Sequence, residues 1–269
     1  MSIHLYLSPH LDDAALSCGG HMLAALAAGT QVRVINIFAG IPDYTHLSAY
    51  ARRQHAKWGN PPDPYAARRA EDAAALAVID AEVENWDDLD AIYRPAGGPF
   101  LYNNHDEVFG PIHPDERGYP VTLAARCDAL AVGLHDVTWF APLAVGGHVD
   151  HRIARDTGFI LHAQGHRVAF YEDFPYAARW QEVAEMLDAS HHAWQPALTA
   201  IDIEGKIALV RAYVSQLTAV FGDETLVETT IRDYAAALAI APDLAGFQKP
   251  VRSAQAAPTY YERTWRIVR

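Results

Sequence analysis

Two short clusters of histidine and aspartate contain the residue types that bind metal ions and transfer protons. The segment SPHLDD (8–13) contains His10, Asp12 and Asp13. The segment GHVDH (147–151) contains His148, Asp150 and His151. Each cluster alone is more typical of a helix cap with a satisfied histidine than of a metal site. Together, at matching positions after two apolar segments, they indicate a metal centre. Three ligands drawn from His and Asp suit zinc, with a fourth position open to water.

The elements around the clusters explain how the two would meet. The apolar segment 3–8 predicts a buried strand, the Ala- and Leu-rich segment 12–29 a helix, and the β-branched segment 31–40 a second strand. This order is a βαβ unit with parallel strands. The second cluster likewise follows a predicted strand (136–143) and opens a predicted helix (146–164). Because open α/β folds bind ligands at the carboxyl edge of their strands, we expect both clusters at that edge.

The rest of the chain continues this alternation. Further helices are predicted over 64–81, 121–134, 204–217 and about 228–241. Further strands are predicted over 89–95, 167–173 and 260–268. The pattern predicts an α/β protein with a Rossmann-like three-layer fold, a mostly parallel sheet and the active site at the carboxyl edge. We expect a single domain over 1–269, with a core over about 1–175 and a C-terminal helical and strand extension over about 176–269.

Composition and charge exclude several classes of protein. With 269 residues, 51% of them hydrophobic and 20% charged, the chain has an ordinary globular balance. The net charge of −12 argues against a nucleic-acid partner, because phosphate binding needs a basic surface. Two cysteines, Cys18 and Cys127, provide neither a disulfide framework nor a cysteine-based zinc site. No targeting segment or membrane-spanning stretch is recognisable, so we expect a cytoplasmic protein without membrane contact.

The two clusters and the segments around them resemble a known family. SPHLDD with the CGG that follows it, and then GHVDH, are similar to the histidine motifs of the zinc-dependent N-acetylglucosaminyl deacetylases, the PIG-L or LmbE-like family. The resemblance covers most of the chain and includes RRAEDAAALAV (68–78), LDAIYR (89–94), FYEDFPYA (170–177) and KIALVRAYVSQ (206–216). It implies a zinc-dependent amidohydrolase that removes an acetyl group from an N-acetylated amino sugar of the N-acetylglucosamine type, or from its conjugate.

The resemblance also implies a role for each residue of the clusters. One zinc ion per chain would be held by His10, Asp13 and His151. Catalysis would involve Asp12 as general base, His148 as the group that polarises the carbonyl, and Asp150 as the residue that orients a histidine. Substrate contacts would come from Arg68 and Asp90. Because nearby carboxylates favour the charged imidazolium, we expect a raised pKa for His148.

Three further features concern the edge of the site. Glu172 and Asp173 end a predicted strand there; contact with the substrate, support of another site residue and a purely structural role are all left open for them. HPDE (113–116) imitates the first cluster, but no strand precedes it in its proline-rich loop, so we predict a turn. Gly146 stands where some relatives carry tyrosine, and Tyr213 where many carry histidine. These two differences concern the choice of substrate more than the reaction.

Two other functions stay open on the sequence. A catalytically inactive protein that binds zinc and sugar would keep the ligands, although the retention of Asp12, which no ligand set needs, argues against it. A Rossmann-like nucleotide-using transferase would share the fold, although the chain has no glycine-rich phosphate loop. We expect a small N-acetyl amino-sugar substrate, selected by the loops 41–63 and 96–120. The sugar and its aglycone, the pathway, the native divalent metal and a homo-oligomeric state are left open.

Overall fold

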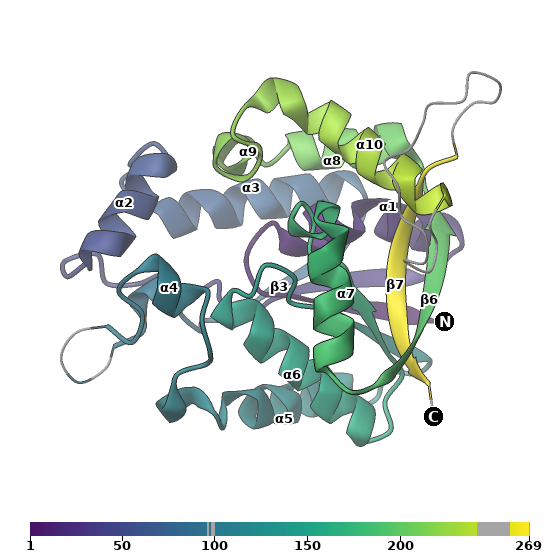
Figure 1. Ribbon diagram of the computed structural model, residues 1–269, viewed down its shortest axis with the longest axis horizontal. Coiled ribbons are helices and arrows are strands. Elements are labelled where there is room, and N and C mark those ends of the chain that lie inside the picture. The colour runs from purple at the N-terminus through teal and green to yellow at the C-terminus, as the bar shows by residue number, and fades with distance from the viewer. Residues whose placement is uncertain (96, 98–99, 241–258, 269) are drawn as a thin grey trace.

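The computed structural model describes residues 1–95, 97, 100–240 and 259–268. Within them, a seven-stranded sheet forms the centre of the protein (Figure 1). Its strands are β1 (Ile3–Ser8), β2 (Gln31–Asn36), β3 (Glu82–Asn85), β4 (Val137–Pro142), β5 (Val168–Tyr171), β6 (Ala193–Ala200) and β7 (Tyr261–Val268). The spatial order is β3-β2-β1-β4-β5-β7-β6. Strands β1 to β5 pair parallel, and β7 pairs antiparallel with both β5 and β6, so the predicted mostly parallel sheet is confirmed.

Helices cover both faces of the sheet. The α-helices are α1 (Asp13–Ala27), α2 (Ala49–Lys57), α3 (Pro64–Val78), α4 (His105–Val108), α5 (Tyr119–Ala131), α6 (Val149–Ala163), α7 (Trp180–Ala189), α8 (Ile203–Arg211), α9 (Val214–Phe221) and α10 (Val227–Ile240). Short 3-10 helices are η1 (Ala91–Tyr93), η2 (Pro114–Glu116), η3 (Tyr176–Ala178) and η4 (Glu224–Leu226). In the described part of the chain, no helix has the length and apolar character needed to cross a membrane.

Alternating side chains of the central strands build two cores. Leu5, Leu7 and Trp139 pack in a cluster with side chains of α5 and α6. Tyr6 and Phe140 point to the other face, into a cluster with α1, α3 and α8. This alternation follows from the two-residue period of a strand. Figure 1 shows the corresponding layers, with α5 and α6 on one side of the sheet and α1, α3, α8 and α10 on the other, so the three-layer prediction is confirmed.

The predicted strand over 89–95 is wrong. Residues 91–93 form η1, because the Asp90 carboxylate accepts the backbone N–H of Ile92 and starts a 3-10 turn. The strand lies earlier, at β3, whose sequence EVEN is charged and only partly buried. Charged residues are common on edge strands, where they discourage pairing with another chain. The apolar pattern that reveals buried strands is therefore missing from β3.

Two more elements differ from the sequence expectation. The helix predicted over 204–217 is divided into α8 and α9. The break is fixed from α3: the Glu71 carboxylate accepts the N–H of Ser215, and the Tyr213 hydroxyl donates to Asp72. Strand β6, which was not predicted, is also an edge strand and contains Pro196, a residue that strands tolerate at sheet edges.

Candidate active site and metal centre

The turn after β1 places the first cluster at the carboxyl edge of the sheet. β1 ends at Ser8, whose hydroxyl donates to the carbonyl oxygen of His10 at 2.6 Å and accepts the N–H of Ala14 at 3.0 Å. These bonds close a tight turn directly before α1. The backbone N–H of His10 also donates to Asp13 Oδ2 at 2.8 Å. Both candidate ligands of this cluster are therefore positioned by a single hydrogen-bonded turn.

Two glycines lead the chain from β4 into α6. Gly146 and Gly147 have φ values of +87° and +81°, a left-handed conformation that is costly for other residues. A Cβ atom at Gly146 would also lie 2.8 Å from Cγ of Tyr176, so a side chain fits there only if this ring moves. His148 then caps α6, and its Nδ1 accepts the N–H of Asp150 at 3.2 Å. The second cluster thus occupies the cap and first turn of α6.

His10, Asp13 and His151 converge as a candidate ligand set. Asp13 Oδ2 lies 3.1 Å from His10 Nδ1 and 3.2 Å from His151 Nε2. Ligand atoms of these three residues all lie within 4.8 Å of one another. Tetrahedral ligands at the usual zinc distances lie about 3.3 Å apart, so this spacing fits an ion of that size. Two imidazoles and one carboxylate also fit zinc chemically, and they leave a fourth position for water or substrate.

A buried carboxylate holds each of these two histidines from behind. His151 Nδ1 lies 2.6 Å from Asp173 Oδ1, and His10 Nε2 lies 3.1 Å from Asp150 Oδ2. A hydrogen on each of these nitrogens leaves the other ring nitrogen, the one facing Asp13, with a free lone pair for a metal. The structure therefore places Asp150 against the candidate ligand His10.

The two acidic residues after β5 have different surroundings. Asp173 contacts His151 and also accepts the N–H of Val145 at 2.8 Å. Glu172 accepts instead from Arg263 Nε at 2.6 Å and Trp265 Nε1 at 2.7 Å, both on β7. Of the possibilities left open by the sequence, Asp173 holds a residue of the site, whereas Glu172 has the structural role of tying β5 to β7. The sequence marks the position, but only the tertiary contacts separate the two roles.

Asp12 lies beside the ligand set without belonging to it. Its Oδ1 is 3.0 Å from Arg68 Nη2, and both side chains are only 7% exposed. Burial raises the pKa of Asp12, while the Arg68 guanidinium opposes this rise. The guanidinium also packs against the rings of Trp58 and Tyr65, at 5.1 Å and 5.5 Å from their centroids. Arg68 therefore fixes the carboxylate that the resemblance identifies as the base, and it lines the same cavity.

Asp90 also faces this cavity, where it accepts the Tyr65 hydroxyl at 2.5 Å. A second group of close donor atoms consists of His10, Asp90, His148 and Asp150. This group is a poor candidate for another cation. Asp150 Oδ1 already lies 2.6 Å from Arg94 Nη2, so a positive charge occupies its free side. The described residues thus favour one metal position, at the first ligand set.

The expected charge on His148 is not supported by the structure. Burial lowers the pKa of His148 to about 3, and this effect exceeds the opposing influence of Asp150. The imidazole is therefore neutral at ordinary pH. Because its Nδ1 accepts the N–H of Asp150, the ring hydrogen resides on Nε2. His148 can then donate a hydrogen bond to a developing negative oxygen without carrying a full charge.

A cavity of about 510 Å³ opens over these residues, a size typical of small-molecule sites. Aromatic side chains of Tyr50, Trp58 and Phe109 form part of its wall, together with the amide of Gln216. The candidate ligands, Asp12, His148, Arg68 and Asp90 supply polar groups. A sugar ring has apolar faces and a polar edge, so it matches this combination of surfaces.

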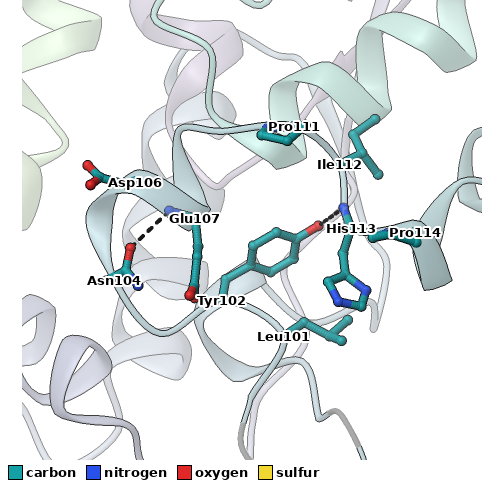
Figure 2. Close-up of a pocket in the computed structure, with 9 residues that line it drawn as sticks. All are labelled: Leu101, Tyr102, Asn104, Asp106, Glu107, Pro111, Ile112, His113 and Pro114. Carbon is teal, nitrogen blue, oxygen red and sulfur yellow. Dashed lines mark hydrogen bonds between the residues drawn. The ribbon is translucent and has the colours of Figure 1, made fainter.

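A second cavity, of about 420 Å³, lies in the loop before α5 and shares no lining residue with the first. Figure 2 shows its side chains, among them Tyr102 and His113. His113 belongs to HPDE, which forms the cap and single 3-10 turn of η2, so the predicted turn is confirmed. The segment that imitates the first cluster therefore contributes no side chain to the lining of the candidate active site.

Comparison with known proteins identifies the family. The sequence profile of GlcNAc-PI de-N-acetylases (PIG-L) matches residues 5–162. A 2'-N-acetylparomamine deacetylase of Niallia circulans is 30% identical over 249 residues, 85% of each chain. The zinc-inhibited form of a teicoplanin deacetylase has a TM-score of 0.81 at 26% identity, over 99% of this chain and 98% of that one. An A40926 pseudoaglycone deacetylase has a TM-score of 0.74 at 29% identity, over 99% and 97%.

The chain therefore belongs to the PIG-L family, as its two histidine motifs indicated. Because its named relatives and structural neighbours are deacetylases, it is a hydrolase that acts on amide bonds. The family resemblance and the class of enzyme predicted from the sequence are confirmed. The alternative of a nucleotide-using transferase is therefore rejected. Its phosphate loop would occupy the turn after β1, where the SPHLDD cluster lies.

Proposed function

We propose that this protein is a zinc-dependent N-deacetylase that removes the acetyl group from an N-acetylated amino sugar of the N-acetylglucosamine type, carried on a larger conjugate. The observation that carries the proposal is the division of the first cluster. His10 and Asp13 face His151 as ligands, while the adjacent Asp12 turns to Arg68. Relatives named for acting on 2'-N-acetylparomamine and teicoplanin support an amino-sugar conjugate as the substrate class.

Asp12 and His148 provide the acid-base chemistry in this proposal. His10, Asp13 and His151 would hold a divalent ion, which would supply Lewis acidity toward water and toward the amide carbonyl. Asp12 accepts a proton from the attacking water and returns it to the departing amine. Nε2–H of His148 donates to the carbonyl oxygen as negative charge develops on it. Arg68 favours the ionised form of Asp12 before the first transfer and holds the carboxyl group in place until the second.

Substrate binding is assigned to the cavity wall. We propose that Asp90 accepts a sugar hydroxyl, since its carboxylate faces the cavity and is held by Tyr65. Arg68 is already paired with Asp12, so its contact with substrate would be made while it keeps that pair. The rings of Trp58 and Phe109 are positioned to cover an apolar face of the sugar.

An amine-release assay tests the proposed function. The protein is stripped of metal and reloaded with zinc, cobalt or manganese, since one related deacetylase was solved in a zinc-inhibited form. It is then offered N-acetylglucosamine, its glycosides and N-acetylated oligosaccharides, with Asp12→Asn as the matched control. Amine release by the wild type with zinc, but not by the variant, supports the proposal. Sugar binding without amine release from any of these compounds, with any of the metals, would make the protein an inactive binder instead.

A further inference from the structure

A chain of buried charged groups joins the candidate ligand His10 to the loop before α5. Asp150, behind His10, has its Oδ1 2.6 Å from Arg94 Nη2. Arg94 Nε in turn lies 2.7 Å from Glu116 Oε1. The side chains of Arg94 and Glu116 are each 7% exposed, and that of Asp150 is 0% exposed. One guanidinium therefore bridges two carboxylates that come from α6 and from η2, away from water.

The far end of this chain lies at the second cavity. Glu116 Oε2 accepts the hydroxyl of Tyr102 at 2.7 Å, and that hydroxyl accepts the backbone N–H of His113 at 2.8 Å. Figure 2 shows the Tyr102 ring directed at this N–H. The Arg94 guanidinium packs against the rings of Phe38 and Tyr102, at 4.9 Å and 5.3 Å. Contacts on several sides thus fix the guanidinium.

Stability alone gives little reason for this arrangement. Desolvating buried ions is costly, and a well-packed apolar cluster of the same volume is often as stable or more stable. What the ions provide is a fixed orientation of Asp150. Its Oδ2 meets His10 Nε2 at 3.1 Å and the N–H of Ala91 at 3.0 Å, and its Oδ1 faces Arg94. Rotation of the carboxylate away from His10 would break two hydrogen bonds of Oδ2 and the ion pair of Oδ1.

We propose that Arg94 and Glu116 are positioning residues for the metal ligand His10, acting through Asp150. This inference rests on the proposed function, because it takes His10 as a ligand. The rigid planar fork of arginine is what allows one side chain to hold two carboxylates, and lysine cannot reproduce it. Glu116 and Tyr102 thereby set the aim of His10 Nδ1 toward the metal, although neither of them lines the active-site cavity.

Charge-conserving variants test this role without changing the net charge of the site. Arg94→Lys removes the fork, and Glu116→Asp shortens its support by one methylene. The matched control is Glu262→Asp. Glu262 forms a buried ion pair with Lys206, in which the two side chains are 3% and 1% exposed. Glu262 also accepts the N–H of Gly20 on α1, away from the ligands. Zinc affinity of the full chain is measured by competition with a chelating indicator, and the thermal midpoint of the metal-stripped protein is recorded for each variant.

We expect Arg94→Lys to weaken zinc binding by about 10-fold, the low end of the usual effect of losing an outer-shell partner, because Arg94 acts on His10 only through Asp150. Glu116→Asp should have a smaller effect, and the mild variant Tyr102→Phe the smallest. Glu262→Asp should lower the thermal midpoint with unchanged zinc affinity. The inference would be overturned if zinc affinity fell in proportion to the thermal midpoint in every variant, including the control Glu262→Asp. Unchanged zinc affinity in folded Arg94→Lys or Tyr102→Phe would also overturn it. Wild-type zinc affinity in His10→Ala would instead show that the proposed ligand set is wrong.

Discussion

Two groups of histidines, His10 with His151 and His4 with His21, differ in their surroundings, and only the first group has the surroundings of a metal site. At the carboxyl edge, the imidazole nitrogens of His10 and His151 are surrounded by carboxylates at 2.6–3.2 Å. In the second group, His4 of β1 stacks on His21 of α1 with centroids 5.6 Å apart and lies 4.8 Å from the ring of Phe140. The second group is therefore enclosed by aromatic rings.

The difference in surroundings reverses the electrostatics. Burial lowers the pKa of all four histidines, because it disfavours the imidazolium form. For His4 and His21 this effect prevails, and the pKa of each falls to about 4. For His151 the carboxylates of Asp13 and Asp173 outweigh burial and raise the pKa to about 10, and the pKa of His10 is raised as well. Burial of a histidine therefore does not indicate a metal site, whereas carboxylates next to its ring nitrogens do.

The largest expected effect comes from replacing one histidine of each group with alanine and comparing the two variants. His151→Ala should lose the metal, since two remaining ligands hold zinc weakly, and amine release should fall to background. His21→Ala should keep the metal and the activity, although it loses a hydrogen bond to Tyr6. Metal analysis after gel filtration, with the amine-release assay, checks both variants. Retention of zinc by His151→Ala would refute the ligand assignment.

The next effect separates metal binding from proton transfer within the first cluster. Asp12→Asn removes the proposed base but keeps the shape of the side chain and its contact with Arg68. We expect kcat to fall by about 10²- to 10⁴-fold, the usual contribution of a general base, with zinc stoichiometry unchanged. Loss of zinc from this variant would show that Asp12 is a ligand rather than a base.

A smaller effect is expected at His148, the one histidine of the carboxyl edge whose pKa is lowered. Replacing it with glutamine keeps a neutral hydrogen-bond donor of different reach, so kcat should fall by about 10²- to 10³-fold. Because His148 is neutral, the alkaline side of the pH–kcat profile should keep its shape in the variant. If the variant lost the alkaline limb of the profile, His148 would have to be charged in the wild-type enzyme.

The smallest effect concerns stability in acid. The pKa values of His4 and His21 are about 4 in the folded chain and about 6.5 when unfolded, so between these values the unfolded chain binds more protons. Their contribution to the free energy of unfolding is complete above pH 6.5 and is lost as the pH falls toward 4. His21→Phe should flatten the dependence by up to about 1.4 kcal/mol per pH unit. Urea unfolding across this range, compared with the wild type, measures it; identical slopes would assign the titration elsewhere.

The elements that could be predicted from the sequence are those whose local residue pattern reflects their burial in the fold. β1 and β4 are apolar because helices cover both of their faces, and the polar clusters stand out directly after them. The edge strands β3 and β6 lack this contrast, and the 3-10 turn η1 depends on a single capping carboxylate. The apolar periodicity of this segment also did not predict the break before α9, because contacts with α3 determine it.

Within the site, the sequence reached the residues that stand in motifs and missed those that reach the site through tertiary contacts. Arg94 was visible as part of LDAIYR, but its contact with Asp150 spans distant parts of the chain. Trp58 and Tyr65, which pack on Arg68, gave no signal beyond ordinary aromatic residues of a helical region. The neutral state of His148 depends on the depth of its burial, which no local pattern encodes.

The position of β7 governs how the sheet can assemble. It lies between β5 and β6 in the sheet, with β6 beside it in Figure 1, and it pairs Trp265 with Phe170 on one side and with Pro196 on the other. Until β7 is in place, β6 has no neighbour and β5 presents an open edge. Pairings between residues so far apart in sequence form slowly, because a long loop must close first. A chain still folding therefore exposes two unpaired strand edges in this half of the molecule, which is where self-association of the nascent protein would begin.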